Sequence, residues 1–276
     1  MTADDTAPAG TTADDTATGM TAVIGGSGFY SFLSDVREHD LDTPYGRPSA
    51  PIAVGDIDGH PVAFLPRHGK EHEHPPHRIN YRANLWALRA AGARRIIAPC
   101  AVGSLRTELG PGELVVPDQL VDRTAARVQT FFDRGAAHVG FADPYCPDLR
   151  ATLLATGELV DGGVMVVIEG PRFSTRAESQ WYAAQGWSLV NMTGHPEAVL
   201  ARELALCYAP VALVTDRDAG IEGGASVDQR EVFAVFEQNM DRLRTLLRAV
   251  VPQISARPHC RCARALDGIQ PPVELP

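Results

Sequence analysis

The sequence has no apolar run near the roughly 20 residues that a membrane-spanning helix needs. Its N-terminus lacks the basic and apolar regions of a secretory signal. It also lacks an excess of positive charge: 25 lysines and arginines stand against 34 aspartates and glutamates, for a formal net charge of −9. Nucleic-acid binding needs a clustered positive face. These absences predict a cytoplasmic protein without nucleic-acid or membrane partners, although a few local cations can still bind a small anion.

Cysteine is also scarce, at five residues in 276. Cys100, Cys146 and Cys207 lie in apolar surroundings and are predicted to be reduced core residues. Cys260 and Cys262 form a Cys-x-Cys pair near the C-terminus. Such a pair can form a strained disulfide or help to bind a metal, but two ligands do not complete a zinc site. The pair therefore predicts either no role or a redox crosslink.

Histidines are concentrated in one segment, at His68, His72, His74 and His77. Histidine spacings of this kind can ligate zinc, and a metal-dependent hydrolase could add nearby carboxylates. However, Pro75 and Pro76 interrupt the segment, so no helix can present these side chains on one face. We therefore expect no metal site.

The chain divides into three parts. Residues 1–20 contain Thr-Ala-Asp-Asp-Thr-Ala twice and no large apolar residue before Met20, which predicts a disordered acidic tail. Met20 is an alternative start of the protein. No strong linker interrupts residues 21–256, which are predicted to form a single catalytic domain. Residues 257–276, with the Cys-x-Cys pair, are predicted to be a C-terminal tail.

From residue 21 onwards the pattern predicts an α/β fold. Short β-branched runs alternate with segments of helical spacing, which is typical of a mixed, largely parallel sheet flanked by helices. The predicted strands are Ala22–Ile24, Ile52–Val54, Val62–Leu65, Arg95–Pro99, Glu113–Val116, Val164–Glu169, Leu189–Met192 and Val211–Thr215. The predicted helices are Tyr81–Ala91, Thr175–Gln185, Glu197–Cys207 and a long C-terminal helix over Gln229–Val250.

Two carboxylates follow one of these strands. Asp216 and Asp218 are one residue apart after the run Pro210–Val214, so an extended chain directs both to the same side. Ligands bind at the carboxyl ends of strands in open parallel sheets. The pair is suited to accept from an amino group and to give a proton to a ring nitrogen, as a purine requires. Met192 and Thr193 follow another strand and place an apolar side chain beside a hydroxyl.

Other strand ends carry groups suited to an anion or a base. Ser27 lies in a glycine-rich turn that fits neither the dinucleotide fingerprint nor the Walker loop. Arg67 and His68 can both donate to phosphate oxygens. Cys100 lies before a turn of small residues, and Phe173 lies in a turn where it could stack on a base. Each feature alone is common in turns and cores, but five strand ends share this chemistry.

Taken together in this order, these motifs closely resemble the trimeric purine nucleoside phosphorylase family, and within it the S-methyl-5′-thioadenosine phosphorylase branch. The resemblance extends from about Ala22 to about Gln253. It implies a nucleoside phosphorylase-like fold, a homotrimer with shared active sites, inorganic phosphate as co-substrate, and no cofactor. His138 resembles a residue that a neighbouring subunit lends to the 5′-substituent pocket.

The resemblance also implies roles for individual residues. The phosphate-binding set is Ser27, Arg67, His68, Cys100, Ala101 and Thr193; Cys100 replaces a threonine that is common there. Met192 would lie under the ribose, with Phe173 in the substrate pocket. Ser174, Asp216 and Asp218 match the set that reads adenine, and we assign the catalytic proton to Asp218 with Asp216 orienting the base. The expected reaction is phosphorolysis of S-methyl-5′-thioadenosine to adenine and S-methyl-5-thio-α-D-ribose 1-phosphate.

Three alternatives remain open. One is a purine nucleoside phosphorylase with 6-oxopurine or mixed preference, because Gly194 and His195 replace a more usual small or branched pair and could reshape the pocket. Another is a phosphorylase of other 5′-deoxy-5′-substituted adenosines. The last, from a different class, is a non-catalytic purine-binding protein or a metal-dependent hydrolase.

Overall fold

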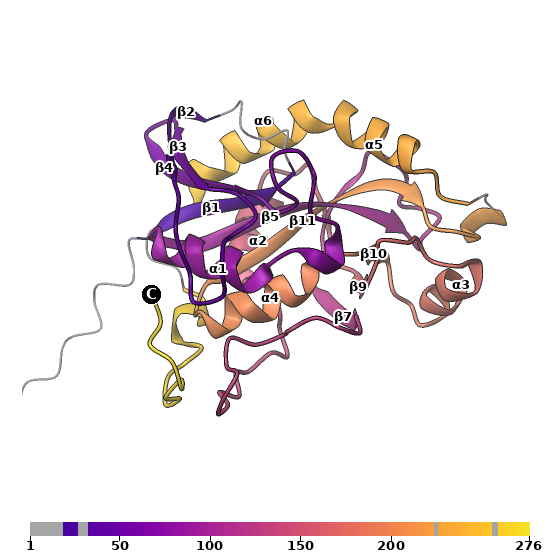
Figure 1. Cartoon of the computed structure of the whole chain (residues 1–276). Helices are drawn as coiled ribbons and strands as arrows, with labels where there is room; N and C mark the ends of the chain where they lie inside the picture. The colour runs from indigo at the N-terminus through magenta and orange to yellow at the C-terminus, as the bar shows by residue number, and fades with distance from the viewer. Residues whose placement is uncertain (1–18, 27–32, 224–225, 256–258) are drawn as a thin grey trace, which may run out of the picture.

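The computed structural model describes residues 19–26, 33–223, 226–255 and 259–276. In these residues a single mixed sheet is surrounded by helices (Figure 1). Its strands are β1 (Met20–Gly25), β2 (Ser34–His39), β3 (Ile52–Ile57), β4 (His60–Pro66), β5 (Ala93–Ser104), β6 (Leu114–Val116), β7 (Gln119–Arg123), β8 (Val160–Asp161), β9 (Val164–Ile168), β10 (Leu189–Asn191) and β11 (Cys207–Arg217). The helices are α1 (Tyr81–Ala90), α2 (Pro147–Leu154), α3 (Arg176–Ala184), α4 (Gly194–Glu203), α5 (Gln229–Gln238) and α6 (Met240–Val250), with short 3-10 turns at Pro76–Arg78, Ile221–Gly223, Val251–Gln253 and Cys262–Arg264.

The sheet is organised around the long strand β5. The strand order is β2-β3-β4-β1-β5-β10-β9-β7, while β11 pairs with the other edge of β5 and leads to β6 and β8. Six of the pairings are parallel and four are antiparallel. The predicted α/β fold with a largely parallel sheet is thus confirmed.

Alternation along the strands divides the core into two layers, because successive side chains of a strand point to opposite faces. Ala22 and Ile24 pack in one apolar cluster with α1 and α4. Val23 packs in a second cluster with α2 and α6. Figure 1 shows α1 and α4 on one side of the sheet and α5 and α6 along the other. Helices therefore cover both faces of the sheet, and the ends of the strands are left for a site.

A gap in the pairing of β5 opens that site. One edge of β5 pairs with β1 up to Ile97 and with β10 at Gly103 and Ser104, so residues 98–102 have no strand partner there within the part of the chain that the structure describes. Pro99 lies inside this gap, where its missing N–H removes no ladder hydrogen bond. The Pro99 carbonyl points into the gap and accepts from Arg67.

The structure corrects several predicted elements. The predicted C-terminal helix is two helices, α5 and α6, with Asn239 between them at φ −101° and ψ 2°. The predicted helix Glu197–Cys207 ends at Glu203, because Cys207 already begins β11. β5 continues to Ser104, beyond the predicted strand end at Pro99, so Cys100 and Ala101 lie inside the strand rather than at its end.

Some elements had no clear sequence signal. The polar strand β2, the strands β7 and β8, and the helix α2 were not predicted. The helices within the described ranges include none with the length and apolar character needed to span a membrane.

Candidate active site

A cavity of about 620 Å³ lies at the ends of β4, β9, β10 and β11 and beside the unpaired part of β5. Helix α5 lines one of its walls. It brings together residues that are far apart in the sequence. Ten of the predicted site residues line it: Arg67, His68, Cys100, Ala101, Phe173, Ser174, Met192, Thr193, Asp216 and Asp218.

Two predicted site residues are not among the lining residues. Ser27 lies outside the described residues, although Gly26 beside it lines the cavity. His138 is exposed, in the irregular segment between β7 and α2, and does not line the cavity of its own chain. Gly194 and His195, which could have reshaped the pocket, do not line it either.

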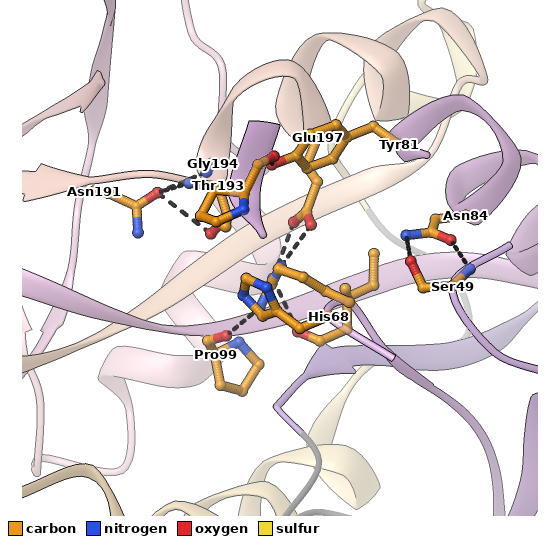
Figure 2. A network of polar contacts seen from close by, with 12 residues as sticks. Ser49, His68, Tyr81, Asn84, Pro99, Asn191, Thr193, Gly194 and Glu197 are labelled. Carbon is orange, nitrogen blue, oxygen red and sulfur yellow. Dashed lines mark hydrogen bonds and ion pairs between the residues drawn. The ribbon is translucent and has the colours of Figure 1, made fainter. Parts of the chain in front are cut away.

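Arg67, directly after β4, is the buried cation of the cavity. Its Nε and Nη2 donate to the two carboxylate oxygens of Glu197 at 2.6 and 3.0 Å. Nη1 donates to the Pro99 carbonyl, and Nη2 also donates to that of Ile24. Four of the five guanidinium N–H groups are thus used, which leaves one on Nη1 for a ligand. Figure 2 shows Glu197 and Pro99 in this network. Arg67 can therefore donate one strong hydrogen bond to phosphate. From the sequence we expected its whole guanidinium group to be free for phosphate.

His68 is oriented by the turn that follows it. Its Nδ1 lies 2.8 Å from the carbonyl oxygen of His74. A carbonyl only accepts, so the proton sits on Nδ1 and the neutral ring presents Nε2 as an acceptor. Burial, assisted by the charge of Arg67, lowers the pKa of His68 to about 3. The neutral ring can thus accept from a protonated phosphate oxygen, whereas the sequence led us to expect a donor.

The segment after β10 is fixed by Asn191. Its side-chain oxygen accepts from the backbone N–H groups of Thr193 and Gly194 at 2.8 and 2.6 Å, as Figure 2 shows. Its amide nitrogen donates to the Ala101 carbonyl across the gap in β5. Because the N–H and C=O of one strand residue point to the same edge, the Ala101 N–H also faces the gap. Thr193 Oγ1, whose bond to Asn191 Oδ1 is long at 3.5 Å, and this N–H can then donate to an anion beside Arg67.

The two carboxylates lie at the other end of the cavity. Asp216 pairs with Gly103 of β5, where a Cβ atom would lie 3.1 Å from Asp216 Oδ2 and 3.3 Å from Asp218 Cβ. Both side chains are therefore on one side of Gly103, as the Asp-x-Asp spacing predicted. Asp218 is buried and accepts from Ser179 Oγ at 2.8 Å. Burial, aided by the charge of Asp218, raises the pKa of Asp216 to about 6, although a hydrogen bond from Thr215 acts in the opposite direction.

The remaining walls are suited to a flat, partly apolar ligand. Ser174 is buried, and its hydroxyl has no hydrogen-bond partner among the described residues. Phe173 and Met192 are half-buried at the cavity. On another wall, α5 supplies the apolar Val232, Phe233 and Phe236 together with the polar Gln229 and Glu237. An unpaired buried hydroxyl between aromatic and apolar side chains indicates a site for a heterocycle with a polar edge.

Sequence reasoning missed several residues that support the site. Glu197 was noted only as part of a segment, yet it also accepts from the Tyr208 hydroxyl at 2.9 Å and is almost fully buried. Its partner Arg67 is 130 residues away, so no local pattern relates them. Ser179 and the α5 wall were likewise assigned no role. Only the apolar face of α5 could have been read from helical periodicity.

The histidines between residues 68 and 77 do not converge as a group of metal ligands within the described residues. The rings of His68 and His72 stack with centroids 4.4 Å apart, and the Nδ1 of His68 is used by His74. Within the described residues, one group of three or more His, Cys, Asp and Glu side chains has converging ligand atoms, and it contains no histidine.

Comparisons with known proteins agree with this geometry. Residues 21–252 match the family described as the phosphorylase superfamily. The chain is 60% identical to the S-methyl-5′-thioadenosine phosphorylase of Mycolicibacterium smegmatis over 93% of this chain and 100% of that protein. It is 57% identical to a purine nucleoside phosphorylase of Streptomyces coelicolor, over 92% and 96% of the two chains. A crystal structure of methylthioadenosine phosphorylase from an Antarctic soil metagenomic library superimposes with a TM-score of 0.86 at 40% identity, covering 91% and 92% of the chains.

Proposed function

The chain belongs to the phosphorylase superfamily, and we propose that it cleaves the N-glycosidic bond of S-methyl-5′-thioadenosine with phosphate. The products are adenine and S-methyl-5-thio-α-D-ribose 1-phosphate. The observation that carries this assignment is the pairing of Asp216 and Asp218 with the unpartnered hydroxyl of Ser174 at one end of the cavity. Carboxylates can accept from the 6-amino group of adenine, which a 6-oxopurine lacks.

The phosphate occupies the other end of the cavity. The free N–H of Arg67, the Thr193 hydroxyl and the Ala101 N–H hold it below C1′ of the ribose, with His68 Nε2 accepting from its protonated oxygen. Ser27 lies outside the described residues, and its phosphate contact stays a prediction from the sequence. Positioning of the nucleophile and electrostatic stabilisation then supply most of the rate enhancement.

The reaction forms a bond from a phosphate oxygen to C1′ while the bond from C1′ to N9 breaks. The departing adenine takes up a proton at N7. The raised pKa of Asp216 favours it as the group that holds this proton, while Asp218, fixed by Ser179, receives the amino group. This exchanges the roles that we assigned to the two residues from the sequence. General acid catalysis of this kind contributes about 10²–10⁴-fold.

The apolar wall of α5 supports a 5′-methylthio group over a hydroxyl. Phe236 lies near Gly26, where a Cβ atom would be 3.6 Å from its ring, and Phe233 packs edge-on against His72 at 5.7 Å. This wall is therefore at the phosphate and ribose end rather than at the carboxylate end. A 5′-hydroxyl there would lose hydrogen bonds to water, which disfavours adenosine itself.

We further propose a homotrimer in the cytoplasm. His138 is exposed and does not line the cavity of its own chain, as expected of a residue that completes a neighbour's site. Sedimentation equilibrium should give three times the 29.6 kDa chain mass. A monomer that remains active would contradict the shared site.

An absorbance assay with methylthioadenosine, adenosine and inosine, each with and without phosphate, tests the function. We expect base release from methylthioadenosine only when phosphate is present. Release without phosphate would indicate a hydrolase. A faster reaction with inosine would indicate a 6-oxopurine phosphorylase instead.

A further inference from the structure

Four of the five cysteines converge on one point away from the active site. Cys146, Cys207, Cys260 and Cys262 have all their Sγ atoms within 4.8 Å of one another, and none of them lines the cavity. All are unbridged in the structure, and only Cys260 is more than slightly exposed. The Sγ atoms of Cys207 and Cys260 are 3.5 Å apart.

We propose that these four cysteines bind one structural zinc ion. Zinc bonds thiolate sulfur at about 2.3 Å in tetrahedral geometry, so sulfurs around one ion lie about 3.8 Å apart. The observed spacing is within a small adjustment of that geometry. Four sulfur ligands close the coordination sphere, which is typical of structural rather than catalytic zinc.

The fold builds this site from three separate segments. Cys146 precedes α2, and its N–H donates to the carbonyl of Tyr208 at 2.8 Å. Cys207 begins β11, the strand that carries Asp216. The two tail cysteines are brought to them by Asp148 of α2, whose Oδ2 accepts from the backbone N–H groups of His259 and Cys260 at 2.5 and 2.9 Å. Hydrogen bonds of the backbone and of the Asp148 side chain therefore hold the three segments together without help from the thiols.

Zinc would bind by replacing the protons of the four thiols. Four neutral thiols bind Zn²⁺, release four protons and leave a site of net charge −2. Arg261 lies between the two tail ligands and Arg264 follows them, so positive charge is close to the site. Without a metal, packing four thiols together would contribute little to stability, because the thiol is a weak hydrogen-bond donor and acceptor.

The ion would tie the C-terminal segment to the body of the enzyme. Beyond the cysteines, Val273 and Leu275 pack against the core cluster of α1 and α4. The carbonyl of Pro276 accepts from Arg89 Nε at 2.9 Å. The segment thus begins at the cysteine cluster and ends on α1, and the ion would fix its starting point. Because metal binds the folded state, it adds its binding free energy to stability.

Metal analysis of untagged protein, purified under reducing conditions from zinc-containing medium, tests the proposal. We expect one zinc per chain by inductively coupled plasma mass spectrometry. Cys260→Ser and Cys262→Ser, which alter only the tail, should lose the metal while methylthioadenosine turnover at moderate temperature is unchanged. Cys100→Ser, the fifth cysteine, is the matched control and should keep it.

Two further measurements separate zinc from the alternatives. Replacement by cobalt should give the visible absorption of tetrahedral cobalt thiolate, and removal of metal should lower the melting temperature and expose four additional reactive thiols. Absence of stoichiometric metal in wild-type protein would overturn the proposal. So would equal metal content in Cys262→Ser, or an unreduced intact mass lighter by four hydrogens, which would indicate two disulfides.

Discussion

The guanidinium of Arg67 is neutralised by the carboxylate of Glu197 through two hydrogen bonds of 2.6 and 3.0 Å, both side chains being almost fully buried. The phosphate end of the cavity is thus built on an ion pair and not on a free cation. A buried charge is tolerated only when its partner remains.

Loss of that partner should therefore destabilise the protein. We expect Glu197→Gln to lower the free energy of unfolding by about 3–5 kcal/mol, because Arg67 stays charged and buried. Phosphate should restore part of this loss, since it supplies negative charge to the remaining N–H of Arg67. Denaturant unfolding with and without phosphate measures both effects. Glu203→Gln, in the same helix but bonded to Thr130 and Phe131, is the control and should show no phosphate dependence beyond that of the wild type.

The proton assignment predicts unequal effects of the two carboxylates. Asp216→Asn should reduce kcat by about 10²–10⁴-fold, because adenine then leaves without its acid. Asp218→Asn should mainly raise KM for the nucleoside. In the wild type, kcat/KM should fall as pH rises through about 6, where Asp216 loses its proton, and this limb should vanish in Asp216→Asn. The same pH limb in both variants would contradict the assignment.

The same pKa predicts how stability varies with pH. Folded Asp216 binds its proton more tightly than the unfolded chain does, so its contribution to stability is complete below pH 3.8 and is lost as pH rises through about 6. The asparagine side chain of Asp216→Asn is uncharged at every pH. The free energy of unfolding of this variant at pH 8 should therefore exceed that of the wild type by about 1–3 kcal/mol, after allowance for solvent screening. Near pH 4 the difference should disappear. Urea unfolding at both pH values measures it.

His68 should remain neutral across the working pH range. Its lowered pKa and its bond to the His74 carbonyl predict an Nδ1–H tautomer with no titration between pH 5 and 8. Nitrogen-15 NMR of the imidazole, assigned with His68→Asn, reports tautomer and charge. A midpoint near the ordinary value of 6.5 in free enzyme would show that the ring donates to phosphate after all.

The lack of a side chain at Gly103 should be essential for binding of the base and unimportant for binding of phosphate. A methyl group there would press on Asp216 and Asp218, so Gly103→Ala should raise KM for methylthioadenosine at least several-fold and leave KM for phosphate nearly unchanged. Gly110→Ala, where a Cβ atom would meet only Arg217 at 3.7 Å, serves as control. Equal changes in both KM values would mean a general distortion of β5.

The sequence by itself determined the alternation of strands and helices, the strand ends that carry Arg67, Phe173 and Thr193, and the shared side of Asp216 and Asp218. These follow from local periodicity, which depends on residues a few positions apart. Only the tertiary structure decided that Glu197 occupies most of the Arg67 fork, that His68 presents an acceptor, and that Cys146 and Cys207 join the Cys-x-Cys pair. The contact with Glu197 and the cysteine cluster depend on packing between segments separated by tens of residues or more. The tautomer of His68 depends on a turn of the backbone to His74, and burial sets its protonation.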